Sequence, residues 1–225
     1  MLPGLQGIAG MVNQGPVVRY LGQYSSTTDR NGTAYPFTIA LGSESPDRLI
    51  VVTAGAAAEN SGGITGATID SVNTTIVAST YFQNTDRGSG AMFSRAIANG
   101  SSASLLIQHN GSPTYSIVVD VFSITGLKSH TPVATAIANG TANSLSTTVN
   151  TAINGVLIAV GGGWGTSLPY TWIGATKVSE LNSGDGGAQL SSAMLEGTLA
   201  QTGRTISWST PSSGSRRVLL AAAWN

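Results

Sequence analysis

The chain is poor in charge and contains no cysteine, and each shortage excludes a kind of chemistry. Charged residues make up 9% of its 225 residues, against roughly 25% in an ordinary soluble domain. The formal net charge is zero, so no long-range field attracts a polyanion such as DNA or an anionic membrane. The absence of cysteine excludes disulfides and thiolate chemistry. We therefore expect neither a nucleic-acid-binding nor a membrane-binding protein.

Histidine is also scarce, which removes most metal and catalytic patterns. Only His109 and His130 are present, so no HExxH and no histidine-based zinc pattern can form. No GxSxG motif and no Walker loop occurs, and GGGWG (161–165) lacks the lysine of a phosphate-binding loop. We predict no metal site, no cofactor and no catalytic residue, and hence a protein that is not an enzyme.

The carboxylates do not form a recognisable pair. Of the ten acidic residues, several adjoin an arginine in a turn-like context, which predicts loop salt links and turn caps; these are Asp29-Arg30, Asp47-Arg48 and Asp86-Arg87. Asp120 differs because it interrupts the apolar run IVVDVF. Its side chain either faces a solvated side of a sheet, pairs with an arginine such as Arg95, or belongs to a site.

Short apolar runs between Gly, Asn, Ser and Pro clusters predict an all-β protein. Runs such as RLIVVTA and RRVLLAAAW suit the middle of a sandwich, whereas TTIVAST alternates as a half-buried strand does. We predict a two-sheet antiparallel β-sandwich, jelly-roll-like, as a single domain over residues 17–225. The expected strands are 17–24, 35–41, 48–54, 65–70, 74–79, 91–98, 102–109, 114–124, 144–151, 155–161, 171–179, 189–195, 204–209 and 216–224.

The pentapeptide AIANG occurs twice, at residues 96–100 and 136–140. Each copy ends in Asn-Gly, a dipeptide that favours the type I′ turn because both central residues of that turn need positive φ. We interpret each copy as a strand end and a tight turn that leads into a return strand. The repeat then marks two related β-meanders, one in each half of the body, and carries no chemistry.

The first 16 residues predict an extended arm in front of the folded body. The stretch lacks Lys and Arg, is broken by glycine and proline, and does not have the pattern of a secretory signal. No run in the chain offers about 20 unbroken apolar residues. The apolar side chains of the arm would gain by docking on the body or on a neighbouring subunit; they are Leu2, Leu5, Ile8, Met11 and Val12.

One aromatic cluster is a candidate contact site. WGTSLPYTW places Trp164, Tyr170 and Trp172 within nine residues. Exposed rings on a β-sandwich loop can stack on the apolar face of a sugar, while Ser, Thr and Asn supply hydrogen bonds. The alternative is that the rings pack over the end of the sandwich or into a subunit contact, since burying a ring contributes about 2 kcal/mol by itself.

The first half of the chain also resembles a known group of proteins. The arm MLPGLQGIAG, the strand TAYPFTIAL, and the segments SPDRLIVVTAGA and GATIDSVNTTIVAS are similar to small jelly-roll proteins of tailed bacteriophages and prophages. In those proteins an ADR-x-VVV strand precedes an xVTIGG-x-A hairpin. Pro46-Asp47-Arg48 with Leu49 to Val52 match the first element, and Ala67 to Asp70 match the second, although Asp70-Ser71 replaces the usual Gly-Gly turn. The resemblance covers roughly residues 1–125.

The resemblance implies a structural role in a virion, such as capsid decoration, head spike or tail attachment. The expected partners are other virion proteins and further copies of the chain, with a trimer as the first expectation. Its place would be the virion, assembled in the host cytoplasm. The alternative function is a carbohydrate- or receptor-binding module that uses Trp164, Tyr170 and Trp172.

Overall fold

The computed structural model describes residues 15–26, 33–58, 62–81, 87–110, 114–164, 168–183, 187–211 and 216–225. In these ranges the chain forms antiparallel β-strands and no helix. The all-β prediction is therefore confirmed. Within the same ranges, no helix has the length and apolar character needed to cross a membrane.

The N-terminal half of the chain forms two sheets. The first inner sheet has the order β1 (Val17–Ser26), β9 (Thr114–Thr125), β3 (Leu49–Ala58), β7 (Arg87–Ala96) and β6 (Thr75–Tyr81). The first outer sheet has the order β2 (Ala34–Ala40), β8 (Ser102–His109), β4 (Ile64–Ile69) and β5 (Val72–Asn73).

The C-terminal half forms two more sheets. The second inner sheet has the order β10 (Ala134–Gly140), β17 (Arg217–Trp224), β12 (Gly155–Trp164), β15 (Ala188–Thr198) and β14 (Thr176–Asn182). The second outer sheet has the order β11 (Ser144–Thr151), β16 (Gln201–Ser209) and β13 (Thr171–Ile173).

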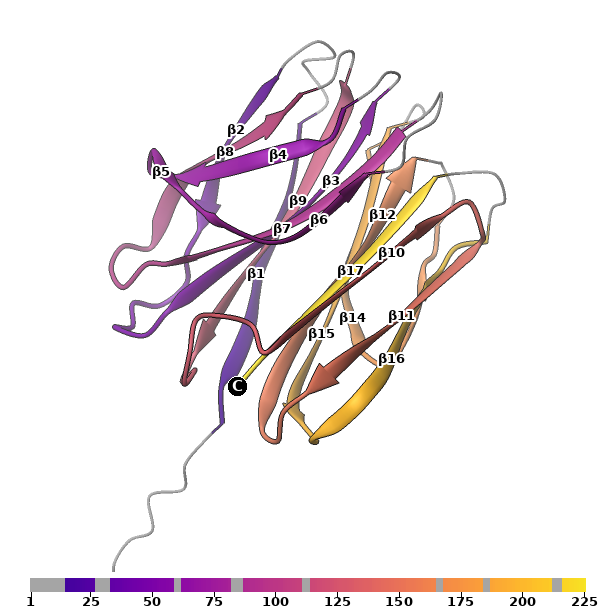
Figure 1. Cartoon of the computed structure of the whole chain (residues 1–225). Helices are drawn as coiled ribbons and strands as arrows, with labels where there is room; N and C mark the ends of the chain where they lie inside the picture. Colours follow the sequence, from indigo (N-terminus) through magenta and orange to yellow (C-terminus); the bar gives the residue numbers. More distant parts are fainter. Residues whose placement is uncertain are drawn as a thin grey trace, which may run out of the picture.

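The four sheets stack as layers, with the two inner sheets packed against each other (Figure 1). The prediction of a two-sheet sandwich was wrong in the number of sheets. An inner strand buries both of its faces: Val52 on β3 belongs to the core under the first outer sheet, whereas Val51 belongs to the core between the inner sheets. Continuous apolar runs such as RLIVVTA are needed for this arrangement, because side chains alternate between the two faces of a strand.

The two halves repeat one strand order. Matching β1, β9, β3, β7 and β6 in turn with β10, β17, β12, β15 and β14 reproduces the first inner sheet in the second. Likewise β2-β8-β4 matches β11-β16-β13. Each half is thus a sandwich of an inner and an outer sheet, and we name them the first and the second sandwich.

The AIANG copies do not mark this duplication. The first copy ends β7 and leads to β8, and the second lies within β10 and leads to β11. Both connections cross from an inner to an outer sheet, so the predicted meanders do not form. The two connections also have different positions in the repeated strand order, because β10 corresponds to β1 and not to β7. The pentapeptide is shared by two similar crossings at different places in the repeated order.

The turn prediction was also wrong in detail. Neither Asn99-Gly100 nor Asn139-Gly140 has positive φ at both residues; Gly100 alone of the four has it. Both residues of Asp70-Ser71 adopt it, with φ of 47° and 62°. This dipeptide joins β4 to β5 at the place where the resemblance expected Gly-Gly.

The five apolar residues of the predicted arm, Leu2, Leu5, Ile8, Met11 and Val12, lie outside the described residues. The description begins at Gly15, where an added Cβ would stand 2.8 Å from the carbonyl oxygen of Asn154. The chain therefore enters the body at the turn between β11 and β12. The domain boundary at residue 17 stays a prediction.

Candidate functional site

The predicted aromatic cluster does not form a shared exposed platform. Tyr170 is 2% exposed and packs on Trp208, with ring centroids 5.2 Å apart. Trp172 is half-buried against the same core, which lies between the second inner and outer sheets. Trp164, also half-buried, packs instead on the core between the two inner sheets. The structure thus separates Trp164 from the other two rings and uses all three in packing.

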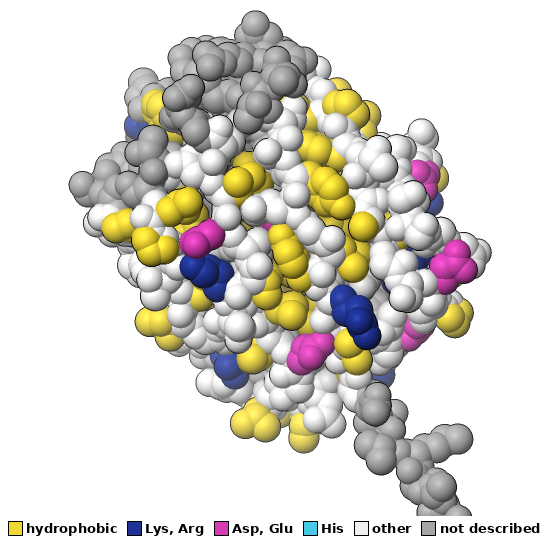
Figure 2. Space-filling model, turned by 180° about the vertical axis from the view of Figure 1, so that it is seen from behind, with side chains coloured by type: hydrophobic (Ala, Val, Ile, Leu, Met, Phe, Trp, Pro, Cys, Tyr) yellow, Lys and Arg dark blue, Asp and Glu magenta, His cyan; other side chains and the backbone are white. Residues whose placement is uncertain are grey.

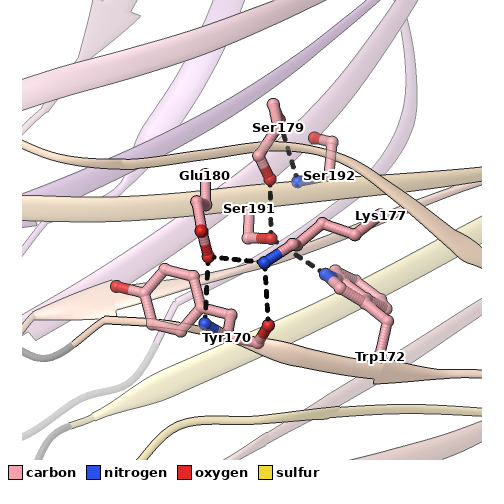
Figure 3. A network of polar contacts seen from close by, with 7 residues as sticks. All are labelled: Tyr170, Trp172, Lys177, Ser179, Glu180, Ser191 and Ser192. Carbon is pink, nitrogen blue, oxygen red and sulfur yellow. Dashed lines mark hydrogen bonds and ion pairs between the residues drawn. The ribbon is translucent and has the colours of Figure 1, made fainter.

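A polar network holds β13 and β14 together (Figure 3). Glu180 accepts a hydrogen bond of 3.0 Å from the Tyr170 N–H, and Lys177 Nζ donates to the Tyr170 carbonyl at 3.2 Å. Lys177 and Glu180 form an ion pair of 2.9 Å. Burial disfavours ionisation of Glu180, but these two partners outweigh it and hold the pKa of Glu180 below its usual range. The charged pair therefore closes the edge between the second inner and outer sheets.

The network continues inward through serines. Trp172 Nε1 donates to Ser191 Oγ at 2.8 Å, and Ser191 Oγ donates to the Ser179 carbonyl at 2.8 Å. Ser179 Oγ accepts from the Ser192 N–H at 3.1 Å. Ser192 Oγ in turn lies 3.2 Å from Thr53 Oγ1 on the first inner sheet. Polar contacts therefore run from the edge of the second sandwich to the interface between the two inner sheets.

Asp120 lies at that interface and is fully buried, with an exposed fraction of 0%. It accepts hydrogen bonds from Ser179 Oγ at 2.6 Å and from Tyr20 Oη at 3.2 Å. Burial raises the pKa of Asp120 to about 6, although the hydroxyl donors oppose the shift. Tyr20 is half-buried, and its partial burial together with the charge of Asp120 raises the pKa of its hydroxyl.

Neither structural role predicted for Asp120 is found. The side chain does not face solvent, and Arg95 Nη1 donates to the Ile69 carbonyl instead. Sequence reasoning missed the role because Ser179, its partner, comes from the other half of the chain. Asp120 links the two sandwiches.

Arg48 takes no part in the predicted salt link with Asp47. Its side chain is 1% exposed, and its guanidinium donates to six backbone carbonyls at 2.7–3.1 Å. The carbonyls belong to two loops and are those of Leu41, Gly42, Ser43, Ile97, Asn99 and Gly100. A planar guanidinium has five N–H donors, so the two donors of Nη1 are shared among the three carbonyls of Leu41, Gly42 and Ser43. Arg48 therefore has a structural role, in which it holds the two loops together.

Asp47 acts as the predicted turn cap. Its carboxylate accepts hydrogen bonds from Ser45 Oγ and from the Gly126 N–H. These bonds hold the pKa of Asp47 below its usual range. The other two acid–arginine neighbours cannot be compared, since Asp29-Arg30 and Asp86 lie outside the described residues and the side chain of Arg87 is likewise not described.

One opening on the first sandwich was not signalled by the sequence. It lies between β4 and β6, has a volume of about 320 Å³, and includes Tyr81, Thr65, Ser79 and Asn110 in its wall. These residues come from three separate segments of the chain, so only the tertiary structure gathers them. None belongs to a motif.

The described ranges contain no group of three or more His, Asp or Glu side chains placed to hold a metal ion. His109 is buried at the end of β8, and His130 is exposed with its Nε2 at 3.2 Å from the Asp47 carbonyl oxygen. No protein-family model matches the chain, and no curated protein matches it in sequence.

Proposed function

We propose that the chain is a non-enzymatic structural protein of a bacteriophage virion, of the capsid-decoration, head-associated or spike type. The observation that carries the proposal is the duplicated strand order. With the eight main strands of one sandwich numbered along the chain, the inner sheet has the order 1-8-3-6-5 and the outer sheet 2-7-4. This order supports a jelly-roll assignment for each half, and jelly rolls recur in viral capsid and lectin domains.

The packing of the two sandwiches also suits a particle component. The inner sheets share one apolar core that includes Phe122 from the first half and Trp224 from the second. Burying large side chains across this interface favours one rigid body over two independently moving units.

The surface supports the same proposal. Charged side chains are few and scattered on the face shown in Figure 2, where uncharged polar atoms and backbone predominate. A free monomer normally relies on mixed charges for solubility. A subunit held by neighbours in a particle has less need of them.

The proposed contact is the apolar segment before Gly15, docked on a neighbouring subunit. The test is light scattering with size-exclusion chromatography on the full chain and on a variant that lacks residues 2–14. We expect a symmetric oligomer, a trimer in the first instance, that dissociates when the segment is removed while the β-sheet circular dichroism is unchanged. A monomer in both forms would refute the assembly role.

A carbohydrate- or receptor-binding module is the second candidate function. The aromatic cluster does not favour it, because Tyr170 is buried and Trp172 is tied to Ser191. The opening between β4 and β6 does favour it.

A further inference from the structure

We propose that the opening between β4 and β6 binds a neutral saccharide. The inference goes beyond the structural role and does not depend on it, because the opening belongs to the first sandwich alone. Its volume of about 320 Å³ lies at the lower end of the range of ligand sites, roughly 300–1,000 Å³. A space of this size suits one sugar unit of a chain better than a large ligand.

The wall of the opening is uncharged and mixes one aromatic ring with hydroxyl and amide groups. Tyr81 supplies the ring, Thr65 and Ser79 supply hydroxyls, and Asn110 supplies an amide. The Thr80 hydroxyl accepts a hydrogen bond of 2.9 Å from Asn139 of the second sandwich and is not counted among these groups. A sugar presents the complementary surface, since its hydroxyls need donors and acceptors and its C–H face packs on a ring. A phosphate or a carboxylate would find no cationic partner among these lining residues.

The ring of Tyr81 has a fixed support. Tyr81 is 47% exposed, so one part of its surface is open to a ligand. Gly63 lies directly beside it: a Cβ added at Gly63 would stand 3.1 Å from Cβ and 3.3 Å from Cγ of Tyr81. The missing side chain at Gly63 therefore lets the tyrosine lie against the backbone. A ring held in place loses little freedom when a ligand stacks on it.

The amide of Asn110 is also positioned by the backbone. Its Oδ1 accepts a hydrogen bond of 2.8 Å from the Gly63 N–H. The Asn110 N–H donates to the Gly63 carbonyl at 3.2 Å. These two bonds hold the end of β8 against the chain that leads into β4, so the wall is built before a ligand arrives.

In the second sandwich, charged side chains occupy the place that corresponds to the opening of the first. When the two inner sheets are matched through their strand registers, Glu180 of β14 falls at the position of Ser79 of β6. Glu180 accepts from the Tyr170 N–H, and Lys177 bonds to the Tyr170 carbonyl (Figure 3). The short hydroxyl of Ser79 cannot reach across in this way. One copy of the edge is thus bridged by charges, and the other is open and neutral.

The test is saturation-transfer difference NMR with glucose, galactose, mannose and N-acetylglucosamine, followed by titration of the sugars that respond. We expect at least one to bind the full chain with a measurable dissociation constant, and Tyr81→Ala to weaken binding by about tenfold or more. Tyr81→Phe should retain binding because it keeps the ring. Ile76→Ala is the matched control, since Ile76 lies on the same strand, is 51% exposed, and is not part of the wall.

Two further variants test the geometry. Gly63→Ala should weaken binding by displacing the ring of Tyr81. Ser79→Glu should weaken it by placing a carboxylate where the second sandwich has that of Glu180. The thermal midpoint of each variant establishes that the protein is folded. The proposal is overturned if none of the four sugars gives a signal, or if Tyr81→Ala binds as tightly as the full chain does. The oligomeric state is measured separately, so either proposal can fail alone.

Discussion

The carboxylate of Asp120, on β9 of the first sandwich, accepts a hydrogen bond of 2.6 Å from Ser179 Oγ, on β14 of the second. This bond crosses the apolar interface between the inner sheets. A buried carboxylate whose neighbours are hydroxyls and not cations is neutralised readily by a proton. The junction between the sandwiches therefore contains a group whose charge depends on pH.

We expect the free energy of unfolding to fall as the pH rises from about 4 to about 6. The pKa of Asp120 is raised from 3.8 to about 6 in the folded protein, so the native state binds more protons than the unfolded state in this window. The stabilising effect of the proton is complete below pH 3.8 and is lost above the folded pKa. The change is on the order of 3 kcal/mol. Urea denaturation at a series of pH values measures it.

Asp120→Asn is the control for this prediction, because it keeps the shape of the side chain and removes the titration. The decline between pH 4 and 6 should then disappear. Asp47 and Glu180 cannot cause it, since their pKa values are lowered, so that their contributions to stability rise with pH and do not fall. A slope that persists in Asp120→Asn would assign the effect to another group.

Arg48→Lys should lower the free energy of unfolding by about 3 kcal/mol or more. A lysine ammonium has three donors at one point and cannot reach two loops, which leaves buried carbonyls unpaired. Chemical denaturation measures the loss. Arg19→Lys, on the exposed face of β1, should change stability by less than about 0.5 kcal/mol. Equal effects from the two substitutions would mean that the hydrogen bonds of Arg48 to the two loops do not stabilise the fold.

Gly161→Ala should destabilise the second sandwich by about 2–3 kcal/mol, because its core has no room for a methyl group. An added Cβ would stand 2.4 Å from the indole ring of Trp208, which is fully buried. Gly66→Ala is the matched control: the atom it meets is the end of the flexible Gln108 side chain, at 3.0 Å. Thermal unfolding of both variants should separate them clearly, and similar midpoints would contradict the packing argument.

Trp172→Ala should lower stability by about 2 kcal/mol or more without affecting sugar binding. The half-buried ring packs on the core between the second inner and outer sheets, and its Nε1 bonds to Ser191. Trp172→Phe keeps most of the packing and should lose only about 1 kcal/mol with the hydrogen bond. Loss of sugar binding in Trp172→Ala with unchanged stability would mean that the sugar binds at the aromatic cluster and not at the opening.

Sequence patterns predicted strand positions well, and they failed where pairing between distant segments decides the outcome. The expected strands did not include β10, although the AIANG copy in it was interpreted as a strand end. The range 171–179 was predicted as one strand, whereas the structure divides it into β13 and β14. The chain turns there at Gly174, whose φ is 89°. An added Cβ at Gly174 would also stand 2.3 Å from the Thr205 carbonyl oxygen, a contact with a strand that is not adjacent in sequence.

The candidate sites likewise depend on contacts between distant segments, which the sequence does not show. The residues of WGTSLPYTW are visible as a cluster, yet their exposure depends on Trp208 and Ser191, which lie elsewhere in the chain. The opening at Tyr81 has no signature, because Gly63 and Asn110 come from other segments. No local pattern could have found it.

The pattern of residues was enough to predict the all-β class, since alternating and continuous apolar runs between turn residues allow strands and little else. The tertiary structure alone decided that there are four sheets in two copies of one order. The physical reason is that a continuous apolar run such as RLIVVTA requires two buried faces but does not specify what covers them. That choice was made by contacts between segments that are distant in the chain, including the bond from Ser179 to Asp120, which lie 59 residues apart.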